Sequence, residues 1–213
     1  VSMFSFTDDP VADALVAAAQ RGVAVKVIVD GDTRGLDGTE YPTLEAGLGT
    51  DRTAPSWVLA CPADRGCVAD RVLSDSTAGI NHNKFFLFSQ VDGASNVVVQ
   101  TSANMTTTQR QDLFNNAVTL TDPGIYTSYR TYFDDLVTYG TRASGLTDYY
   151  TTTTSGPYKT YFFPRHESSG TTYRTDPSTD TVKLILDNVS CSGGTQIRVA
   201  MLVFTRTQVA QKL

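Results

Sequence analysis

The sequence predicts an α/β protein whose mainly parallel or mixed sheet is flanked by helices. Three observations lead to this fold class. A strand at 1–6, a helix at 11–20 and a strand at 23–29 follow one another within thirty residues, which is typical of a right-handed βαβ unit. Two more strands with a tight turn between them lie at 84–99, and 213 residues are enough to bury a sizeable core.

Local signals set the ends of these elements. The first helix starts at 7–10, where capping side chains precede a proline, and Gly22 ends it. The strand at 23–29 is rich in β-branched residues. Farther along, the same signals predict a helix at 43–48, a strand at 56–61, a helix at 109–114, a strand at 117–121 and a long helix at 123–139 with an apolar stripe of Tyr129, Tyr132, Phe133 and Leu136.

Three aspartates after the second strand, Asp30, Asp32 and Asp37, raise the question of a calcium loop. Arg34 stands where an EF-hand loop needs an oxygen ligand, and no glutamate closes the loop. We therefore interpret the three aspartates as turn residues and expect no metal site.

Charge and composition narrow the class of protein. The 22 acidic and 17 basic residues give a net charge of −5, so we expect no general attraction to nucleic acid or to an anionic membrane. No run approaches the roughly 18 apolar residues that a transmembrane helix needs. Abundant Thr, Ser, Tyr and Gly are typical of exported bacterial enzymes. We therefore expect a secreted, extracellular protein whose signal peptide is not in this chain.

The three cysteines fit an oxidising compartment. Cys61 and Cys67 enclose a turn-rich loop that a disulfide could close, the alternative being two unpaired thiols. The spacing and the lack of nearby histidines argue against zinc. Cys191 is left over, either free or paired beyond Leu213.

The stretch from His82 to Asn104 carries the candidate chemistry. His82 and Lys84 lie two apart on a strand, so their side chains leave the same face. Ser102 and Asn104 follow the next, valine-rich strand, so these groups could converge at neighbouring strand ends. The combination suits a phosphate, because a cation and amide donors can hold its oxygens while a neutral imidazole attacks phosphorus.

His82-Asn83-Lys84 followed by Ser102-Ala103-Asn104 resembles the H-x-K-x4-D and G-S-x-N signature of the phospholipase D superfamily. The resemblance extends over the whole chain. The sequence departs from the signature at two positions, because Ser89 stands where the aspartate is expected and Thr101 where the glycine is expected.

The resemblance implies a two-step phosphodiester exchange through a phosphohistidine, with no metal or other cofactor. His82 would be the nucleophile, or alternatively the general acid that protonates the leaving alcohol. Lys84 and Asn104 would hold the non-bridging oxygens, with Ser102 a weaker phosphate-binding candidate. Ser89 would replace an aspartate that supports the site from behind.

A repeat suggests a second lobe. Residues 199–205 repeat 1–7 at an offset of 198 (204 − 6). We therefore expect a first lobe at 1–140, an inter-lobe connection rich in Gly, Ser, Thr and Tyr at 141–193, and the first strand and helix start of a truncated second lobe at 194–213. The family resembled usually has two lobes, each with one H-x-K, and His166 in the connection lacks that context.

Three functions stay open at this point. The first is an exported phospholipase D-like phosphodiesterase, whose expected substrate is a phospholipid rather than a nucleic acid, with a second lobe of the full-length chain completing the site. The second is a nuclease with one lobe per chain that completes its site as a homodimer. The third, motivated by Ser89 and the single H-x-K, is a non-catalytic lobe that binds phosphate or a partner.

Overall fold

The chain forms two units in the computed structural model. Residues 1–147 and 152–161 make the first unit, and 148–151 and 162–213 the second. The structure describes every residue except 64, 69–78, 145–148, 150, 164–180 and 191. His166, Cys191 and much of the predicted connection therefore lie outside the described residues.

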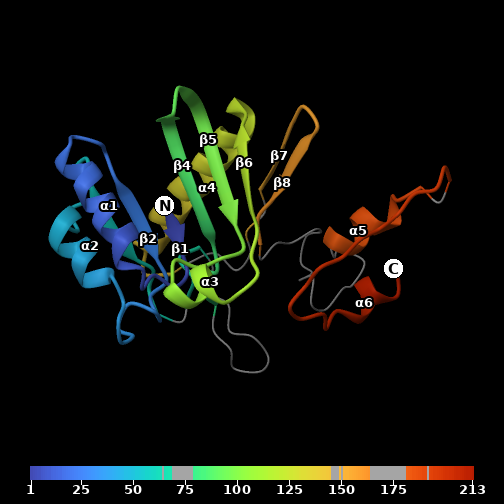
Figure 1. The fold of residues 1–213 in the computed structure, drawn as a ribbon, viewed down its shortest axis with the longest axis horizontal. Helices are drawn as coiled ribbons and strands as arrows, with labels where there is room; N and C mark the ends of the chain where they lie inside the picture. Colours follow the sequence, from blue (N-terminus) through green and yellow to red (C-terminus); the bar gives the residue numbers. More distant parts are fainter. Residues whose placement is uncertain (64, 69–78, 145–148, 150, 164–180, 191) are drawn as a thin grey trace. The chain divides into compact units, whose positions relative to one another are not determined.

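The first unit is built on one mixed sheet (Figure 1). Its six strands, among the described residues, run in the order β3-β2-β1-β4-β5-β6. The strands span Ser2–Met3 (β1), Lys26–Val29 (β2), Trp57–Ala60 (β3), Lys84–Val91 (β4), Ala94–Thr101 (β5) and Ala117–Thr121 (β6). The α/β fold class predicted from the sequence is confirmed.

Only one half of this sheet is parallel. β1 pairs in parallel with β2, and β2 with β3, as the βαβ pattern predicted. The β1–β4, β4–β5 and β5–β6 pairs are antiparallel. Asp92 and Gly93, both with positive φ, close β4 and β5 into a hairpin, which forces antiparallel pairing. The sheet is therefore mixed rather than mainly parallel.

Helices cover both faces of the sheet. On one face, α1 (Asp9–Gln20) and α2 (Tyr41–Leu48) enclose an apolar core with the strands, built from Met3, Phe6, Ala12, Val25, Val27, Val29, Tyr41, Leu44, Leu48 and Val58. On the other face lies α4 (Pro123–Gly140), whose Tyr129 ring meets Phe85 edge-on at 5.2 Å between centroids and whose Phe133 stacks on Trp57. The apolar stripe predicted for the long helix is thus core.

Two predicted elements differ in the structure. The short helix α3 spans Thr107–Gln111, earlier than the predicted 109–114, because the Thr106 hydroxyl accepts from the Gln109 N–H and caps it. Within the predicted connection, β7 (Thr152–Ser155) and β8 (Tyr158–Tyr161) form a hairpin. A hydroxyl pair 2.9 Å apart, Ser128 and Thr160, ties this hairpin to α4.

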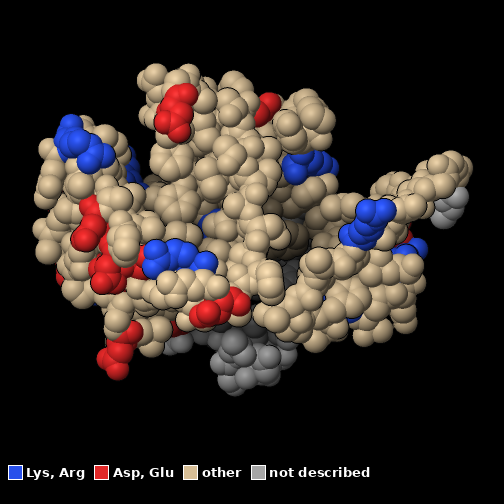
Figure 2. Space-filling view, in the orientation of Figure 1, with Lys and Arg blue, Asp and Glu red and all other residues tan. Residues whose placement is uncertain are grey.

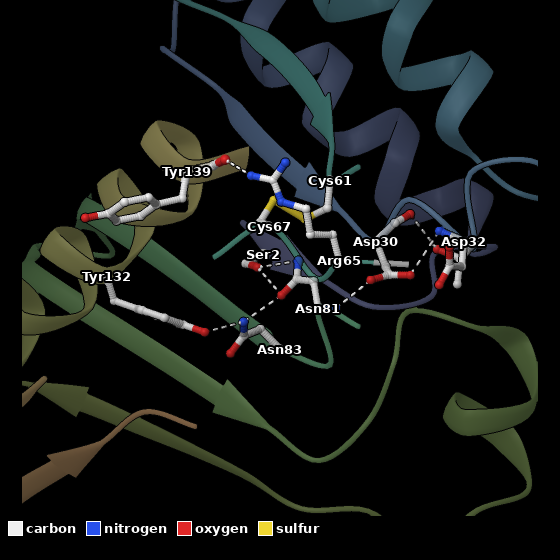
Figure 3. The surroundings of a disulfide bond; sticks show 11 residues. Ser2, Asp30, Asp32, Cys61, Arg65, Cys67, Asn81, Asn83, Tyr132 and Tyr139 are labelled. Atoms are coloured by element: carbon white, nitrogen blue, oxygen red, sulfur yellow. Dashed lines mark hydrogen bonds between the residues drawn. A yellow bond between two sulfur atoms is a disulfide. The ribbon is translucent and has the colours of Figure 1, made fainter. Parts of the chain in front are cut away.

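A disulfide joins Cys61 and Cys67, as predicted. Arg65, inside the closed loop, donates to the carbonyl oxygen of Tyr139 near the end of α4 at 2.5 Å (Figure 3). It also donates to the carbonyl oxygen of Arg142, just beyond this helix, at 2.7 Å. A cation there complements both the orphan carbonyls and the helix dipole. The loop after β3 is thereby tied to the opposite helix layer.

In the second unit, α5 (Thr181–Asp187) and α6 (Thr207–Ala210) are linked by Lys212, which pairs with Asp187 at 2.5 Å. The strand expected at 199–205 is not formed, and Leu202 and Val203 are largely exposed. The same sequence pattern at 1–7 forms β1 because β2 and β4 flank it there. The second-lobe assignment stays a prediction.

Hydropathy along the helices bears on membrane insertion. Among the helices that the structure describes, none has the length and apolar character required to cross a bilayer.

Candidate active site

The candidate residues gather at one edge of the sheet. The carboxyl ends of β1, β2, β3 and β5 meet the amino ends of β4 and β6 there, because β4 and β6 run antiparallel to their neighbours. His82 and Lys84 stand at the start of β4, and Ser102 and Asn104 at the end of β5. The loop holding α3 crosses the same end (Figure 1).

Lys84 is a buried cation. Its side chain is only 5% exposed, and Nζ donates to the carbonyl oxygen of His82 at 2.9 Å. The ammonium also lies 5.5 Å from the centroid of the Phe4 ring. Burial lowers the pKa of Lys84 from 10.5 to about 8. The group is therefore still mainly charged at pH 7 and suited to an incoming anion.

His82 presents its imidazole beside this cation. The side chain is exposed, and one flank of its ring lies 5.0 Å from the Phe4 ring between centroids. Desolvation lowers the pKa of His82 below 6.5, and the neighbouring Lys84 charge lowers it further. The imidazole is hence neutral at pH 7, the form that a nucleophile requires.

Asn104 reaches the same region through the segment that follows β1. Its Oδ1 accepts from the Ser5 backbone N–H at 3.3 Å, and Phe6 and Met105 form a β-bridge. One residue earlier, Phe4 N–H donates to the Asn83 carbonyl oxygen at 2.9 Å. Residues 4–6 therefore connect the His82 segment to the Asn104 segment. With Oδ1 engaged, Nδ2 is the part of the Asn104 amide suited to donate to a phosphate oxygen.

Ser102 is tied to a neighbouring loop. Its hydroxyl donates to Asn115 Oδ1 at 3.0 Å and accepts from Asn116 N–H at 3.0 Å. The hydroxyl proton is thus used within the protein, so the geometry supports a role in holding the loop before β6. Phosphate binding by Ser102 stays a prediction.

Ser89 does not join the site. It lies five residues along β4 from Lys84 in a continuous strand and is exposed. At about 3.3 Å per residue this places it about 16 Å away. The prediction that Ser89 supports the site from behind is wrong, because an extended strand carries the residue to the hairpin end of the sheet.

Several residues at the site were not predicted from the sequence. Phe4 contacts both His82 and Lys84, and Gln109 Oε1 accepts from the Asn104 N–H at 2.6 Å. Asp30, interpreted as a turn residue, is buried and accepts a hydrogen bond from the N–H of Asn81, the residue before His82. A carboxylate directly after a buried parallel strand was the available signal, since the carboxyl ends of such strands share one edge with the site.

The family model described as the cardiolipin synthase, PLD-like domain matches residues 1–137. This match spans the sheet, the candidate site and nearly all of α4. The chain belongs to the phospholipase D superfamily. Members of this superfamily are phosphodiesterases, so the family prediction made from His82, Lys84 and Asn104 is confirmed.

Two solved structures are similar to this chain. NucT from Helicobacter pylori has a TM-score of 0.50 and 16% sequence identity, over 65% of this chain and 77% of that one. Nuc from Salmonella typhimurium, a phospholipase D family member, has a TM-score of 0.47 and 22% identity, over 65% and 76% of the two chains. At 16% identity the likeness to NucT shows the fold alone. No curated protein sequence matches the chain.

Proposed function

We propose that this chain is a phosphodiesterase of the phospholipase D type that works through a phosphohistidine at His82. The observation that carries the proposal is the pairing of a neutral imidazole with a buried ammonium, Lys84, at one sheet edge. A phosphate bound there supplies negative charge to the Lys84 ammonium, for which no ion pair is found among the described residues, and the Asn104 amide supplies a second donor.

The proposed reaction has two steps. A His82 nitrogen attacks phosphorus, a P–N bond forms, and the P–O bond to the first alcohol breaks. That alcohol leaves with a proton supplied by a general acid or by water. Water or a second alcohol then attacks the phosphohistidine, and the P–N bond breaks to return the free imidazole. Lys84 and Asn104 stabilise the charge on the non-bridging oxygens in both steps.

We propose a phospholipid-like diester as the substrate. Leu113 and Phe114, which precede the Asn115 that bonds Ser102, are 55% and fully exposed. Exposed apolar side chains beside a phosphate site suit a substrate with acyl chains. Lys and Arg are dispersed on the face seen in Figure 2 rather than gathered in a stripe, and the net charge is −5, which is unfavourable for a nucleic-acid backbone.

A comparison of two substrates tests whether the protein cleaves a phospholipid or a nucleic acid. One assay uses mixed vesicles that contain phosphatidylcholine, and a second assay uses a single-stranded DNA oligonucleotide. Both assays are run with the protein and with its His82→Asn variant. The proposal expects head-group release from the vesicles that depends on His82. Cleavage of DNA alone, falling steeply with added salt, would instead favour the nuclease. Binding of phosphate without turnover of either substrate would favour the non-catalytic lobe.

We also propose that the protein acts outside the cytoplasm. The disulfide between Cys61 and Cys67 supports this, because such bonds persist in oxidising compartments. Detection of the native protein in culture medium, with the bond intact after thiol alkylation, is the expected result. Retention in the cytosol with both thiols alkylated would contradict it.

A further inference from the structure

Asp30 is a buried carboxylate that the proposed reaction does not use. It follows β2 directly and is 1% exposed. Oδ2 accepts from the Asn81 backbone N–H at 2.5 Å, and Oδ1 accepts from the Asp32 backbone N–H at 3.1 Å (Figure 3). A carboxylate aimed at the N–H of the residue before His82 constrains the backbone that delivers the imidazole.

The residues on both sides of His82 are held by side-chain hydrogen bonds. Asn83 donates through Nδ2 to Asn81 Oδ1 at 2.6 Å and to the Tyr132 hydroxyl at 2.9 Å. Asn81, 1% exposed, also exchanges hydrogen bonds with the Ser2 hydroxyl at 3.2–3.4 Å. Figure 3 shows these side chains as one continuous network from Asp30 to Tyr132.

The loop closed by the disulfide packs against the backbone next to Asp30 and Asn81. A side chain at Gly31, next to Asp30, would collide with the Cys61 carbonyl oxygen. A Cβ at Gly66 would lie 2.7 Å from the carbonyl carbon of Ile80, the residue before Asn81. The loop closed by the disulfide therefore packs against the backbone on either side of the Asp30–Asn81 hydrogen bond.

We propose that the Asp30–Asn81 pair positions His82, with Asp30 acting through the backbone and not on the substrate. The inference rests on the proposed function for its catalytic consequence. Three backbone polar groups of 81–83 are hydrogen-bonded: the Asn81 N–H to Asp30, the His82 carbonyl oxygen to Lys84 and the Asn83 carbonyl oxygen to Phe4. These bonds limit where the backbone can place the imidazole, whose ring lies 5.0 Å from the Phe4 ring between centroids. Preorganisation of this kind matters because a displacement of about 1 Å costs about 100-fold in rate.

The Asp30→Asn variant tests this, with Asp37→Asn as the matched control. The introduced amide keeps the size of the carboxylate but turns an N–H₂ toward one of the two backbone N–H groups, whereas Asp37 is exposed in the loop that follows Asp30. The substrate is bis(4-nitrophenyl) phosphate, whose good leaving group needs no proton donor. We expect kcat to fall at least about 10-fold with KM changed less than about 2-fold for Asp30→Asn, and no change for the control.

A spectroscopic readout separates this inference from the proposed function. The chain has two histidines, so a His166→Gln background leaves the His82 ring as the one imidazole in the proton spectrum. We expect its nuclear Overhauser contacts with the Phe4 ring to weaken in Asp30→Asn and to persist in Asp37→Asn. This measurement tests the inference even if the protein does not turn over the diester. Absence of turnover would contradict the proposed function but not the positioning of His82.

Unchanged kcat in Asp30→Asn, or a lower kcat with unaltered His82–Phe4 contacts, overturns the inference. If Asp30→Asn does not fold, Ser2→Ala replaces it, because it removes the hydroxyl partner of Asn81 while leaving the core apolar. Ser2→Ala is expected to lower kcat several-fold and to weaken the same contacts. Wild-type values of kcat and of the ring contacts in a folded Ser2→Ala protein would then overturn the inference.

Discussion

Lys84 Nζ donates a 2.9 Å hydrogen bond to the carbonyl oxygen of His82, two residues earlier on the chain. The cation is thereby held beside the residue that is proposed to attack phosphorus. Burial against Phe4 leaves the ammonium poorly solvated, which lowers its pKa to about 8. An anion that enters the site relieves this cost, so substrate and cation stabilise one another.

The two shifted pKa values predict a bell-shaped pH profile. The proposed reaction requires neutral His82, whose pKa is below 6.5, and protonated Lys84, whose pKa is about 8. We expect kcat/KM for bis(4-nitrophenyl) phosphate to fall at pH values below the His82 pKa and again above about pH 8. Lys84→Arg is expected to keep the acid limb and lose the alkaline one. A wild-type rate that still climbs at pH 9 would contradict this assignment.

Lys84→Met is expected to trade activity for stability. The folded-state pKa of Lys84 lies below its unfolded value, so between about pH 8 and 10.5 the unfolded chain binds more protons than the folded protein. The free energy of unfolding therefore rises with pH through this window. Below pH 8 the buried charge of Lys84 lowers the free energy of unfolding by about 3 kcal/mol, because each unit of pKa shift corresponds to about 1.36 kcal/mol. Met fills the same space without charge, so its urea midpoint should rise at pH 7 while turnover is lost.

Lys26→Met is the control for this exchange, because Lys26 is an exposed residue of β2 and Trp57 flanks it. Its urea midpoint at pH 7 should stay close to the wild-type value, and its stability should still rise between about pH 8 and 10.5, because Lys84 is present. A Lys84→Met protein that is less stable than wild type at pH 7 would show that the buried ammonium stabilises the fold.

The Asn104→Asp variant tests the roles of the amide oxygen and the amide nitrogen of Asn104 separately. The carboxylate can still accept from Ser5 N–H, so the free energy of unfolding should change by less than about 1 kcal/mol. It replaces a donor with a negative oxygen facing the phosphate, so kcat/KM should fall by about 100-fold or more. Asn96→Asp, at the other end of β5, adds the same charge away from the site and is expected to be neutral. Equal activities of the two variants would exclude Asn104 as a phosphate ligand.

Removal of the disulfide tests its contribution to the fold. Cys61 and Cys67 are six residues apart in sequence, and a loop this short contributes about 2 kcal/mol through the unfolded chain. The Cys61→Ser/Cys67→Ser double variant should lose about that much in urea unfolding. Added reductant should destabilise wild type equally and the double variant no further; a reductant effect on the double variant would point to another cause.

Short-range patterns predicted which candidate residues lie at one edge of the sheet. His82 and Lys84 share a face because of strand alternation, and Asn104 follows the next strand of the same hairpin, so twenty-odd residues of sequence place all three at one sheet edge. Ser89 was predicted to support the site, but it is five residues from Lys84 in a continuous strand and hence on the other face and far along β4.

What the sequence did not reveal depends on contacts between distant segments. Phe4 reaches His82 across 78 residues (82 − 4), and Asp30 meets Asn81 across 51. Asp30 looked like a turn residue because local spacing contains no information on burial. The β7–β8 hairpin was not predicted for a similar reason. Its Thr-rich strands resemble a linker in sequence, and the contact with Ser128 of α4 that holds the hairpin is not visible from local sequence.

Trapping the covalent intermediate tests the central claim most directly. The protein is mixed with bis(4-nitrophenyl) phosphate, quenched in alkali within the first turnover, and digested for mass spectrometry. The account predicts a nitrophenyl phosphate adduct on the peptide with His82, absent from His82→Asn and not found on the peptide with His166. Turnover without an adduct, or an adduct that persists in His82→Asn, would contradict a phosphohistidine at this site.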